Sequence, residues 1–425
     1  MNHIRGEKKL LIFSDCYIYG GSERLLSSVI LSQLIQKNYQ IYYAYRKHRY
    51  YEKGLNEQYG KNRKNFFPLF LLSNDTIFYN INKLKFNSFI KKVFMFPLWC
   101  LQKTGFYFVY NFLAIIFLLK KIQPDLVHVN NGGYPGAKSC GAFVAAAAVQ
   151  KIKNVVYQVN NIAYEQKNIL AKWFDKNVIN KNVKFYITAS QKAKEFLAKN
   201  RHFDLKKIKL VPNTVTIKST QRNRDDILKL FSLPVNSFLI CEVAFLSKRK
   251  GQIYLLEALK KIRLTNNDLY NKFKIILVGD GEEEGILKKF IYDNNLEANV
   301  FLTGYRSDSI DFINACDVFI LPSISNEDMP LVVLEAMRLG KTIIASKFGG
   351  IEEEIENNVS GVLIEPNLIS FSSDLAKSII DLYINNKSEF YGFNARERYN
   401  KYFSAEHREL LLIKIYRLSE NINEF

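Results

Sequence analysis

Two glutamates separated by seven residues, Glu327 and Glu335, lie in the stretch SNEDMPLVVLEAM at 325–337. The stretch follows DVFILPS, an apolar run that predicts a buried strand leading into a loop and then a helix. Glu335 shares its helix face with apolar side chains, so we expect it to be buried. An ionised carboxylate in such a place is costly unless hydrogen-bond donors surround it.

The helix that carries Glu335 is suited to binding a nucleotide. Pro330 fits the first turn of a helix, and we expect the backbone at Met329, Pro330 and Leu331 to bind an anion there. The two hydroxyls of a ribose would supply the donors that a buried Glu335 needs. Glu327 would then face the group attached to the phosphate. The alternative is a capped core helix with two structural acids.

Apolar strands alternate with helical patterns along the whole chain, in two series. The first series lies at 9–13, 39–44, 125–129, 154–159, 184–188 and 207–211, and the second at 238–243, 273–278, 299–302, 317–321, 342–345 and 361–364. Such alternation predicts an α/β fold of two doubly wound, Rossmann-like domains with parallel sheets. We expect an N-terminal domain at 1–212, a C-terminal domain at 213–395, and a helical segment at 396–425 that packs back on the N-terminal domain.

The charge of the chain is unevenly distributed. The net charge is +19, yet residues 1–212 hold 34 Lys and Arg against 11 Asp and Glu, whereas residues 213–425 carry a net negative charge. A basic half is compatible with nucleic acid or with an anionic membrane surface. Five widely spaced cysteines suggest no disulfide or zinc framework, so we expect reduced thiols in the cytoplasm. The first apolar run predicts a core strand rather than a signal peptide.

Residues 81–121 are basic, aromatic and apolar. The run 104–119 is shorter than the ~20 residues that a spanning helix needs. Two interpretations remain open, namely a core helix preceding the strand at 125–129 and a helix pair that touches a membrane surface.

The glutamate pair belongs to a longer ordered pattern. GYRSDSIDFINACDVFILPSISNEDMPLVVLEAMRLGKTIIASKFGGIEEEIENNVSGVLIEP spans 304–366, and VPN, KRKGQIYLLEAL and LVGDGEEEGILKKF precede it. The set resembles the C-terminal domain of the family-four retaining glycosyltransferases, whose GT-B fold has two Rossmann-like domains facing a cleft. Over 1–204 the resemblance is weaker and rests on GGSERL, HVNNGG and VVYQVNNIAYEQ.

The resemblance implies roles for several residues near the donor. Glu327 would contact the hydroxyls of the transferred sugar, and Glu335 would hold the nucleotide ribose. Lys250 would bind the donor diphosphate, where positive charge stabilises the leaving group. Further donor contacts are expected at Gly20, Gly21, Arg249, Tyr305 and Arg306.

Two positions depart from the family pattern. Phe245 replaces an arginine that usually lies six residues before the glycine of the K-G turn, and Arg249 is a candidate for the missing positive charge. Asn160 replaces a histidine, and its amide can contact the acceptor or the sugar but cannot carry a proton near neutral pH. The departures leave open a catalytically impaired nucleotide-sugar-binding subunit.

The family resemblance implies a retaining hexosyltransferase that needs neither metal nor other cofactor. No Asp-x-Asp occurs, the histidines lack ligand spacing, and three glutamates at 282–284 would repel a dinucleotide at the glycine-rich turn. We expect a UDP- or GDP-sugar donor and a lipid-linked glycan acceptor, at the inner face of the cytoplasmic membrane, in capsule or lipopolysaccharide synthesis. The rivals are a sugar-nucleotide epimerase of the same fold and a nucleic-acid protein, although we expect no nucleic acid as partner.

Overall fold

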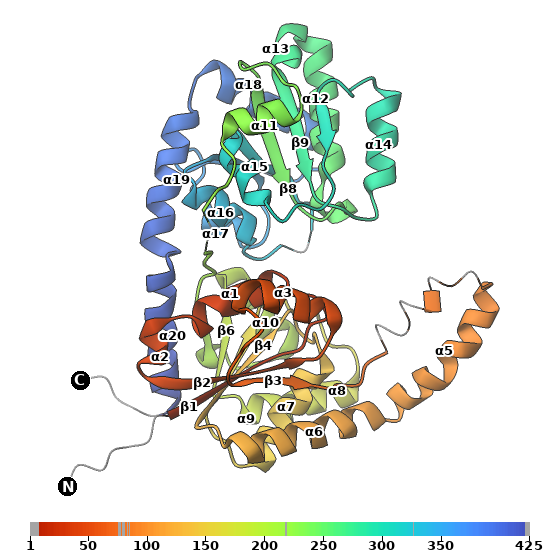
Figure 1. Ribbon diagram of the computed structural model, residues 1–425, viewed down its shortest axis with the longest axis vertical. Helices are drawn as coiled ribbons and strands as arrows, with labels where there is room; N and C mark the ends of the chain where they lie inside the picture. The colour runs from red at the N-terminus through yellow and green to blue at the C-terminus, as the bar shows by residue number, and fades with distance from the viewer. Residues whose placement is uncertain are drawn as a thin grey trace. The chain divides into compact units, whose positions relative to one another are not determined.

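The structure is a computed structural model that describes residues 8–420 except 75–77, 79, 80, 83, 85, 217, 218 and 326. It divides into two compact units (Figure 1). The first comprises Met1–Thr188, Lys194–Val211 and Glu409–Phe425, as far as they are described, and the second comprises Ala189–Ala193 and Pro212–Arg408. The expected helical segment 396–425 is therefore shared between the two units, and its last five residues lie outside the described part.

The first unit contains a seven-stranded parallel sheet in the order β3-β2-β1-β4-β5-β6-β7. Its strands are β1 (Lys8–Ser14), β2 (Tyr39–Arg46), β3 (Phe66–Leu69), β4 (Leu126–Asn131), β5 (Val155–Val159), β6 (Phe185–Thr188) and β7 (Ile208–Leu210). The sequence missed β3, because the four residues FFPL include a proline and form only the edge of the sheet.

Helices cover both faces of this sheet, because its central strands are apolar on both sides. They are α1 (Gly21–Ile30), α2 (Gln33–Gln36), α3 (Arg49–Tyr59), α5 (Ser88–Lys103), α6 (Phe106–Ile122), α7 (Lys138–Val149), α8 (Ile169–Phe174), α9 (Asn180–Asn182) and α10 (Gln191–Arg201). One core lies under α6 and α7, and the other lies under α1, α3 and the C-terminal helix.

The second unit contains a six-stranded parallel sheet in the order β10-β9-β8-β11-β12-β13. Its strands are β8 (Phe238–Val243), β9 (Phe273–Val278), β10 (Val300–Leu302), β11 (Val318–Leu321), β12 (Thr342–Ser346) and β13 (Val362–Ile364). Its helices are α11 (Arg224–Leu230), α12 (Gln252–Thr265), α13 (Asn267–Lys272), α14 (Glu284–Asp293), α15 (Ser309–Ala315), α16 (Leu331–Arg338), α17 (Ile351–Glu354), α18 (Phe371–Ile384) and α19 (Ser388–Tyr402). The predicted α/β class with two parallel sheets is confirmed.

The helix pair α5–α6 falls in the segment that the sequence left open. Among the helices that the structure describes, none is both long and apolar enough to cross a membrane alone. The two helices meet that requirement only together, and the chain bends by 57° between them.

The last helix, α20 (Ala405–Ser419), contributes to the core of the first unit. Leu412 and Tyr416 are fully buried there, and the Tyr416 hydroxyl lies 2.6 Å from Nδ1 of His128. Lys8 forms an ion pair of 2.8 Å with Glu420 just beyond the helix. These contacts tie the end of the described chain to its first strand.

Replacing Leu412 with alanine should destabilise the first unit by about 2–5 kcal/mol, the usual cost of a core cavity. Leu410→Ala is the matched control, because Leu410 is 61% exposed on the same helix and its loss should cost less than about 0.5 kcal/mol. Denaturant unfolding followed by hydrogen exchange in β1 measures both. Equal effects of the two variants would contradict the assigned packing.

Candidate functional site

The candidate site lies at the carboxyl edge of the second sheet. The chain order reverses between β8 and β11, which are hydrogen-bonded neighbours. Ligands of open α/β sheets bind at such a switch point, beyond the carboxyl ends of the strands. Lys250 follows β8 and Glu327 follows β11, so the fold itself brings the two predicted residues to this point.

The Glu327 carboxylate is the centre of a buried ion cluster. Its side chain is 7% exposed, and its Oε1 lies 2.5 Å from Nζ of Lys250 and 2.8 Å from Nη1 of Arg249. The Ser323 hydroxyl donates to the same oxygen at 3.2 Å. Two cations and one hydroxyl therefore satisfy a carboxylate that would otherwise be costly to bury. The structure thus brings together three of the residues predicted from the sequence, counting Arg249.

Lys250 is positioned by the turn in which it lies. It ends a short 3-10 helix, Lys248–Lys250, and is followed by Gly251 with φ of +74°. A Cβ atom at Gly251 would lie 2.0 Å from the carbonyl oxygen of Pro322. Only glycine allows this approach, and it holds the lysine turn directly against the loop that carries Glu327.

A second glycine supports the Glu327 loop from the other side. Gly349 follows β12 with φ of +60°, and a Cβ atom there would lie 1.9 Å from the carbonyl oxygen of Glu327. The GG pair at 349–350 therefore packs on the backbone of the catalytic loop. The sequence had suggested only a turn at this place.

The start of α16 differs in part from the expected anion site. The helix begins at Leu331, and Pro330 is its N-cap residue. Proline has no N–H, so the donors at this end belong to the neighbouring residues. Met329 is buried, and its carbonyl accepts from the Asn213 side chain at 2.8 Å, which anchors the start of the helix to the VPN segment.

Glu335 is half-buried, so the expectation of full burial was wrong. Its helix neighbours Leu334 and Ala336 are buried completely, while Glu335 lies at the margin of that face. A half-buried carboxylate keeps access to solvent and to a ligand. Its predicted contact with a ribose stays a prediction.

Three further acids near Glu327 are buried, and the sequence analysis did not single them out. They are Glu242 in β8, Asp328 and Glu354 in α17. Burial raises the pKa of Asp328 to about 7 and raises the pKa of both glutamates well above their usual range. Neither carboxylate oxygen of Glu354 has a hydrogen-bond partner among the described residues. The one available signal was an acid inside the apolar strand FLICEV.

The expected contacts with the base are less well formed. Tyr305 is 69% exposed. Arg306 is held by Asp308, with Nε and Nη2 at 2.8 and 2.7 Å from its two oxygens. Phe245, at the arginine position of the family, is exposed and leaves the Glu327 cluster to Lys250 and Arg249.

In the first unit, the predicted glycines lie at the start of α1. Gly20 is its N-cap residue, and the Gly20 N–H donates to the Glu23 carboxylate at 3.2 Å. A Cβ atom at Gly20 would meet Glu23 at an ordinary 3.7 Å. Packing therefore does not demand glycine there, which is compatible with the predicted approach of a ligand to Gly20 and Gly21.

Asn160 is part of an internal hydrogen-bond network. Its Nδ2 donates to Oδ1 of Asn130 at 2.7 Å and to the carbonyl of Asn131 at 3.0 Å, and its Oδ1 accepts from Gln158. Asn130 in turn donates to Ser14 at 3.2 Å. The amide joins the ends of β4 and β5, so its contact with an acceptor stays a prediction.

A cavity of about 240 Å³ lies at the carboxyl edge of the first sheet. Asp15 and Arg46, which form a buried ion pair, lie on one side. Gln102 of α5 and Tyr107 and Asn111 of α6 lie on another. Its charged, amide and aromatic lining suits a sugar or a sugar phosphate, and the sequence did not predict it.

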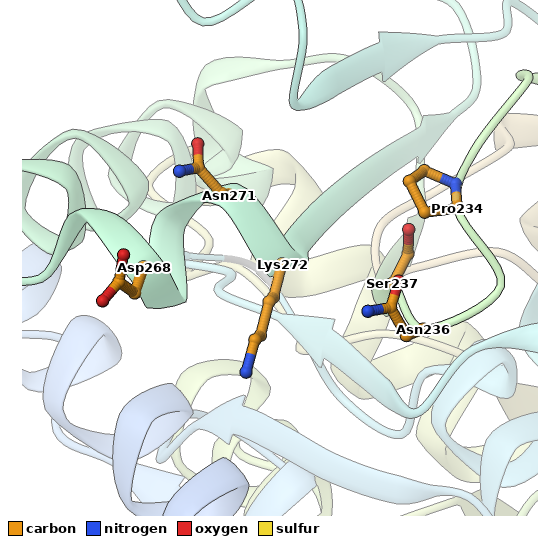
Figure 2. Close-up of a pocket in the computed structure, with 6 residues that line it drawn as sticks. All are labelled: Pro234, Asn236, Ser237, Asp268, Asn271 and Lys272. Carbon is orange, nitrogen blue, oxygen red and sulfur yellow. The ribbon is translucent and has the colours of Figure 1, made fainter.

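A larger hollow of about 410 Å³ is not part of this site. Figure 2 shows its lining, which includes Ser237 before β8 and Lys272 before β9. It lies at the amino ends of the strands, opposite the edge at which such sheets bind ligands. Among the described residues, no group of three or more His, Cys, Asp or Glu side chains could hold a metal ion.

Asp328→Asn should remove a pH dependence from the stability of the second unit. Between the unfolded pKa of about 4 and the folded pKa of about 7, the folded protein keeps a proton that the unfolded chain releases, so stability falls as pH rises. The variant should gain up to about 4 kcal/mol relative to wild type at pH 8 and little at pH 4. Denaturant unfolding at both pH values checks this, and an equal difference at each would contradict it.

Comparison with known proteins agrees with this geometry. The sequence matches the profile described as Glycosyl transferases group 1 over 223–404 and that described as Glycosyltransferase Family 4 over 84–218. It is 30% identical, over 73% of this chain and 82% of the relative, to the Escherichia coli UDP-Gal:alpha-D-GlcNAc-diphosphoundecaprenol alpha-1,3-galactosyltransferase. It is 27% identical, over 41% of this chain and 48% of the relative, to the Salmonella typhimurium lipopolysaccharide 1,2-N-acetylglucosaminetransferase.

Solved structures share the fold. Anabaena Alr3699/HepE in complex with UDP superposes with a TM-score of 0.71 at 19% identity, covering 97% of this chain and all of that one. The same protein with UDP-glucose gives a TM-score of 0.68 at 19% identity, over 97% and 99% of the two chains. The chain therefore belongs to the group 1 glycosyltransferases of family four and has their GT-B fold.

Proposed function

We propose that the protein transfers a hexose from a UDP- or GDP-sugar to a lipid-linked glycan, with retention of configuration and without a metal ion. The observation that carries this proposal is the contact of Lys250 and Arg249 with the buried Glu327 at the switch point of the second sheet. The site offers two cations for a diphosphate and one carboxylate for sugar hydroxyls. The second unit would bind the donor, and the first would bind the acceptor.

The ion cluster suggests how the leaving group is stabilised. Arriving phosphate oxygens would compete with Glu327 for Lys250 and Arg249, and hydroxyls of the transferred sugar would donate to the carboxylate in exchange. As the bond from the sugar carbon to the diphosphate breaks, negative charge grows on the diphosphate and both cations stabilise it. The two side chains thus supply charge that a metal supplies in other transferases.

The new bond would form on the face from which the diphosphate leaves. The acceptor hydroxyl oxygen attacks the sugar carbon, and its proton passes to an oxygen of the departing phosphate. Glu327 positions the sugar and stabilises positive charge near the reacting carbon. Because two cations and Ser323 already bind this carboxylate, it is a weak nucleophile. A trapped ester between sugar and Glu327 would contradict this route.

The relatives support the choice of substrates. The name of the E. coli relative gives a UDP-sugar as donor and a diphosphoundecaprenol-linked sugar as acceptor, and HepE has been crystallised with UDP-glucose. We therefore favour UDP over GDP. The basic first half suits an acceptor and a membrane that both carry negative charge. This places the protein on the inner face of the cytoplasmic membrane, in lipopolysaccharide or capsule synthesis.

Donor binding can be tested by calorimetry with UDP, GDP, ADP and CMP. We expect one preferred nucleotide, UDP, and a loss of affinity of about ten-fold or more in Glu335→Ala, because the ribose loses a charged hydrogen-bond acceptor. Glu352→Ala is a control at a half-buried glutamate outside the proposed contact. Folded protein that binds none of the four nucleotides would contradict the proposal.

The lysine run provides a matched test of catalysis. Lys250→Met should lower kcat/KM by about 100-fold or more, because the diphosphate loses a buried cation. Lys248→Met should leave it nearly unchanged, since Lys248 is exposed in the same turn. EDTA should also have little effect. Turnover is followed as UDP release from UDP-glucose or UDP-galactose with a diphosphoprenol-linked sugar.

The same assay separates the rival functions. An epimerase would convert the nucleotide sugar without an acceptor. An impaired subunit would bind the nucleotide and release no product. Equal losses in the Lys248 and Lys250 variants would show that the run acts only as surface charge.

A further inference from the structure

Helix α5 has no core of its own to cover. None of its sixteen residues, all of which the structure describes, is buried. Phe89, Phe96 and Trp99 are 74%, 63% and 48% exposed. In Figure 1 the helix extends from α6 beyond the layer of helices that covers the first sheet. Such an apolar surface is unusual in a protein that has no partner for it.

Helix α6 is apolar on two opposite faces. Its inner stripe, which includes Ile115 and Leu119, is buried in the core beneath the sheet. Its outer stripe follows the helical period and is exposed, at Phe106, Val109, Tyr110, Leu113 and Phe117. Both interpretations of this segment therefore apply, since one face of the helix belongs to the core and the other is free to dock.

The exposed apolar surface continues onto α8. The ring of Phe174 in α8 contacts the ring of Phe108 in α6, with centroids 5.6 Å apart. Ile169, Leu170 and Trp173 of α8 are 81%, 79% and 60% exposed. We call these three residues, the outer stripe of α6 and the exposed side chains of α5 the aromatic face. Both tryptophans of the chain lie on it.

The charge around the aromatic face is of one sign. No Asp or Glu occurs between Asp75 and Asp125, whereas seven lysines do, at 83, 85, 91, 92, 103, 120 and 121. Lys103 lies with its ammonium 5.1 Å from the Trp99 ring centre, so cation and aromatic side chain share one surface. Aromatic rings beside lysines are typical of segments that lie in the interface of anionic membranes. A second copy of the chain would bring like charges together.

We propose that the aromatic face docks on an anionic lipid bilayer, lying in its interface without crossing it. The 57° bend and the buried inner stripe of α6 exclude a straight span by this pair within the fold described. The inference rests on the proposed function for its purpose. Gln102, Tyr107 and Asn111 line the cavity at the edge of the first sheet, so docking would bring that cavity to a lipid-linked acceptor.

The test uses wild-type protein and vesicles of phosphatidylglycerol or phosphatidylcholine. We expect flotation with phosphatidylglycerol vesicles at low salt, weaker flotation at high salt, and little with phosphatidylcholine. Tryptophan emission should shift to the blue on phosphatidylglycerol, and Trp99→Phe and Trp173→Phe should each keep part of the shift. These readouts require no acceptor and no turnover.

A triple variant tests the aromatic face itself. Phe89→Ser, Phe96→Ser and Phe117→Ser together should lower vesicle affinity by about ten-fold or more, because each removes a side chain that would enter the interface. The control is Phe390→Ser with Phe393→Ser on α19, which are 57% and 67% exposed in the second unit. The control should bind vesicles as wild type does, and both variants should keep UDP affinity.

The outcomes separate this inference from the proposed function. Wild type that binds UDP and fails to bind phosphatidylglycerol vesicles overturns the docking inference alone. Vesicle binding without nucleotide binding supports docking and contradicts the transferase proposal. Unchanged vesicle affinity in the triple variant overturns the aromatic face as the docking element, as does lipid-free wild-type dimer that the triple variant converts to monomer.

Discussion

The buried Glu327 carboxylate is the constraint on which the catalytic edge of the second sheet depends. A negative charge at this depth needs cations, and the chain provides them from the turn after the neighbouring strand. The turn can come so close only because Gly251 meets the carbonyl of Pro322 without a side chain, and Gly349 does the same at the carbonyl of Glu327. The loop is thus held from both sides by backbone contacts, and its charges are arranged before a donor arrives.

The other acids at this edge explain how an anionic donor can be accommodated there. Glu242, Asp328 and Glu354 would repel a diphosphate if they were ionised. Burial raises the pKa of each, so the protonated form is favoured. The charge that a donor meets is then dominated by Lys250, Arg249 and the single carboxylate between them. A site of this composition can exchange carboxylate for phosphate at its cations without gaining excess negative charge.

In the first unit, the helices α5, α6 and α8 combine two physical roles in one surface. The sheet needs the inner stripe of α6, whereas nothing in the described chain covers the outer stripe. Asn111 connects the two roles, because its side chain binds both the N–H and the carbonyl of Leu72 and also lines the cavity. A movement of these helices would therefore be felt at the proposed acceptor site.

The sequence by itself determined the α/β class, the two parallel sheets and the family, because strand runs and motif order are local properties of the chain. It also indicated Glu327 and Lys250, since their types and places in the motif carry the chemistry. Only the tertiary structure decided that the two side chains touch, that Glu335 is half-buried, and that Asp328 and Glu354 lie beside them. Burial and proximity depend on how distant segments pack. The periodicity of α6 likewise gave an apolar helix, but which apolar stripe faces the core follows from the position of the sheet beside it.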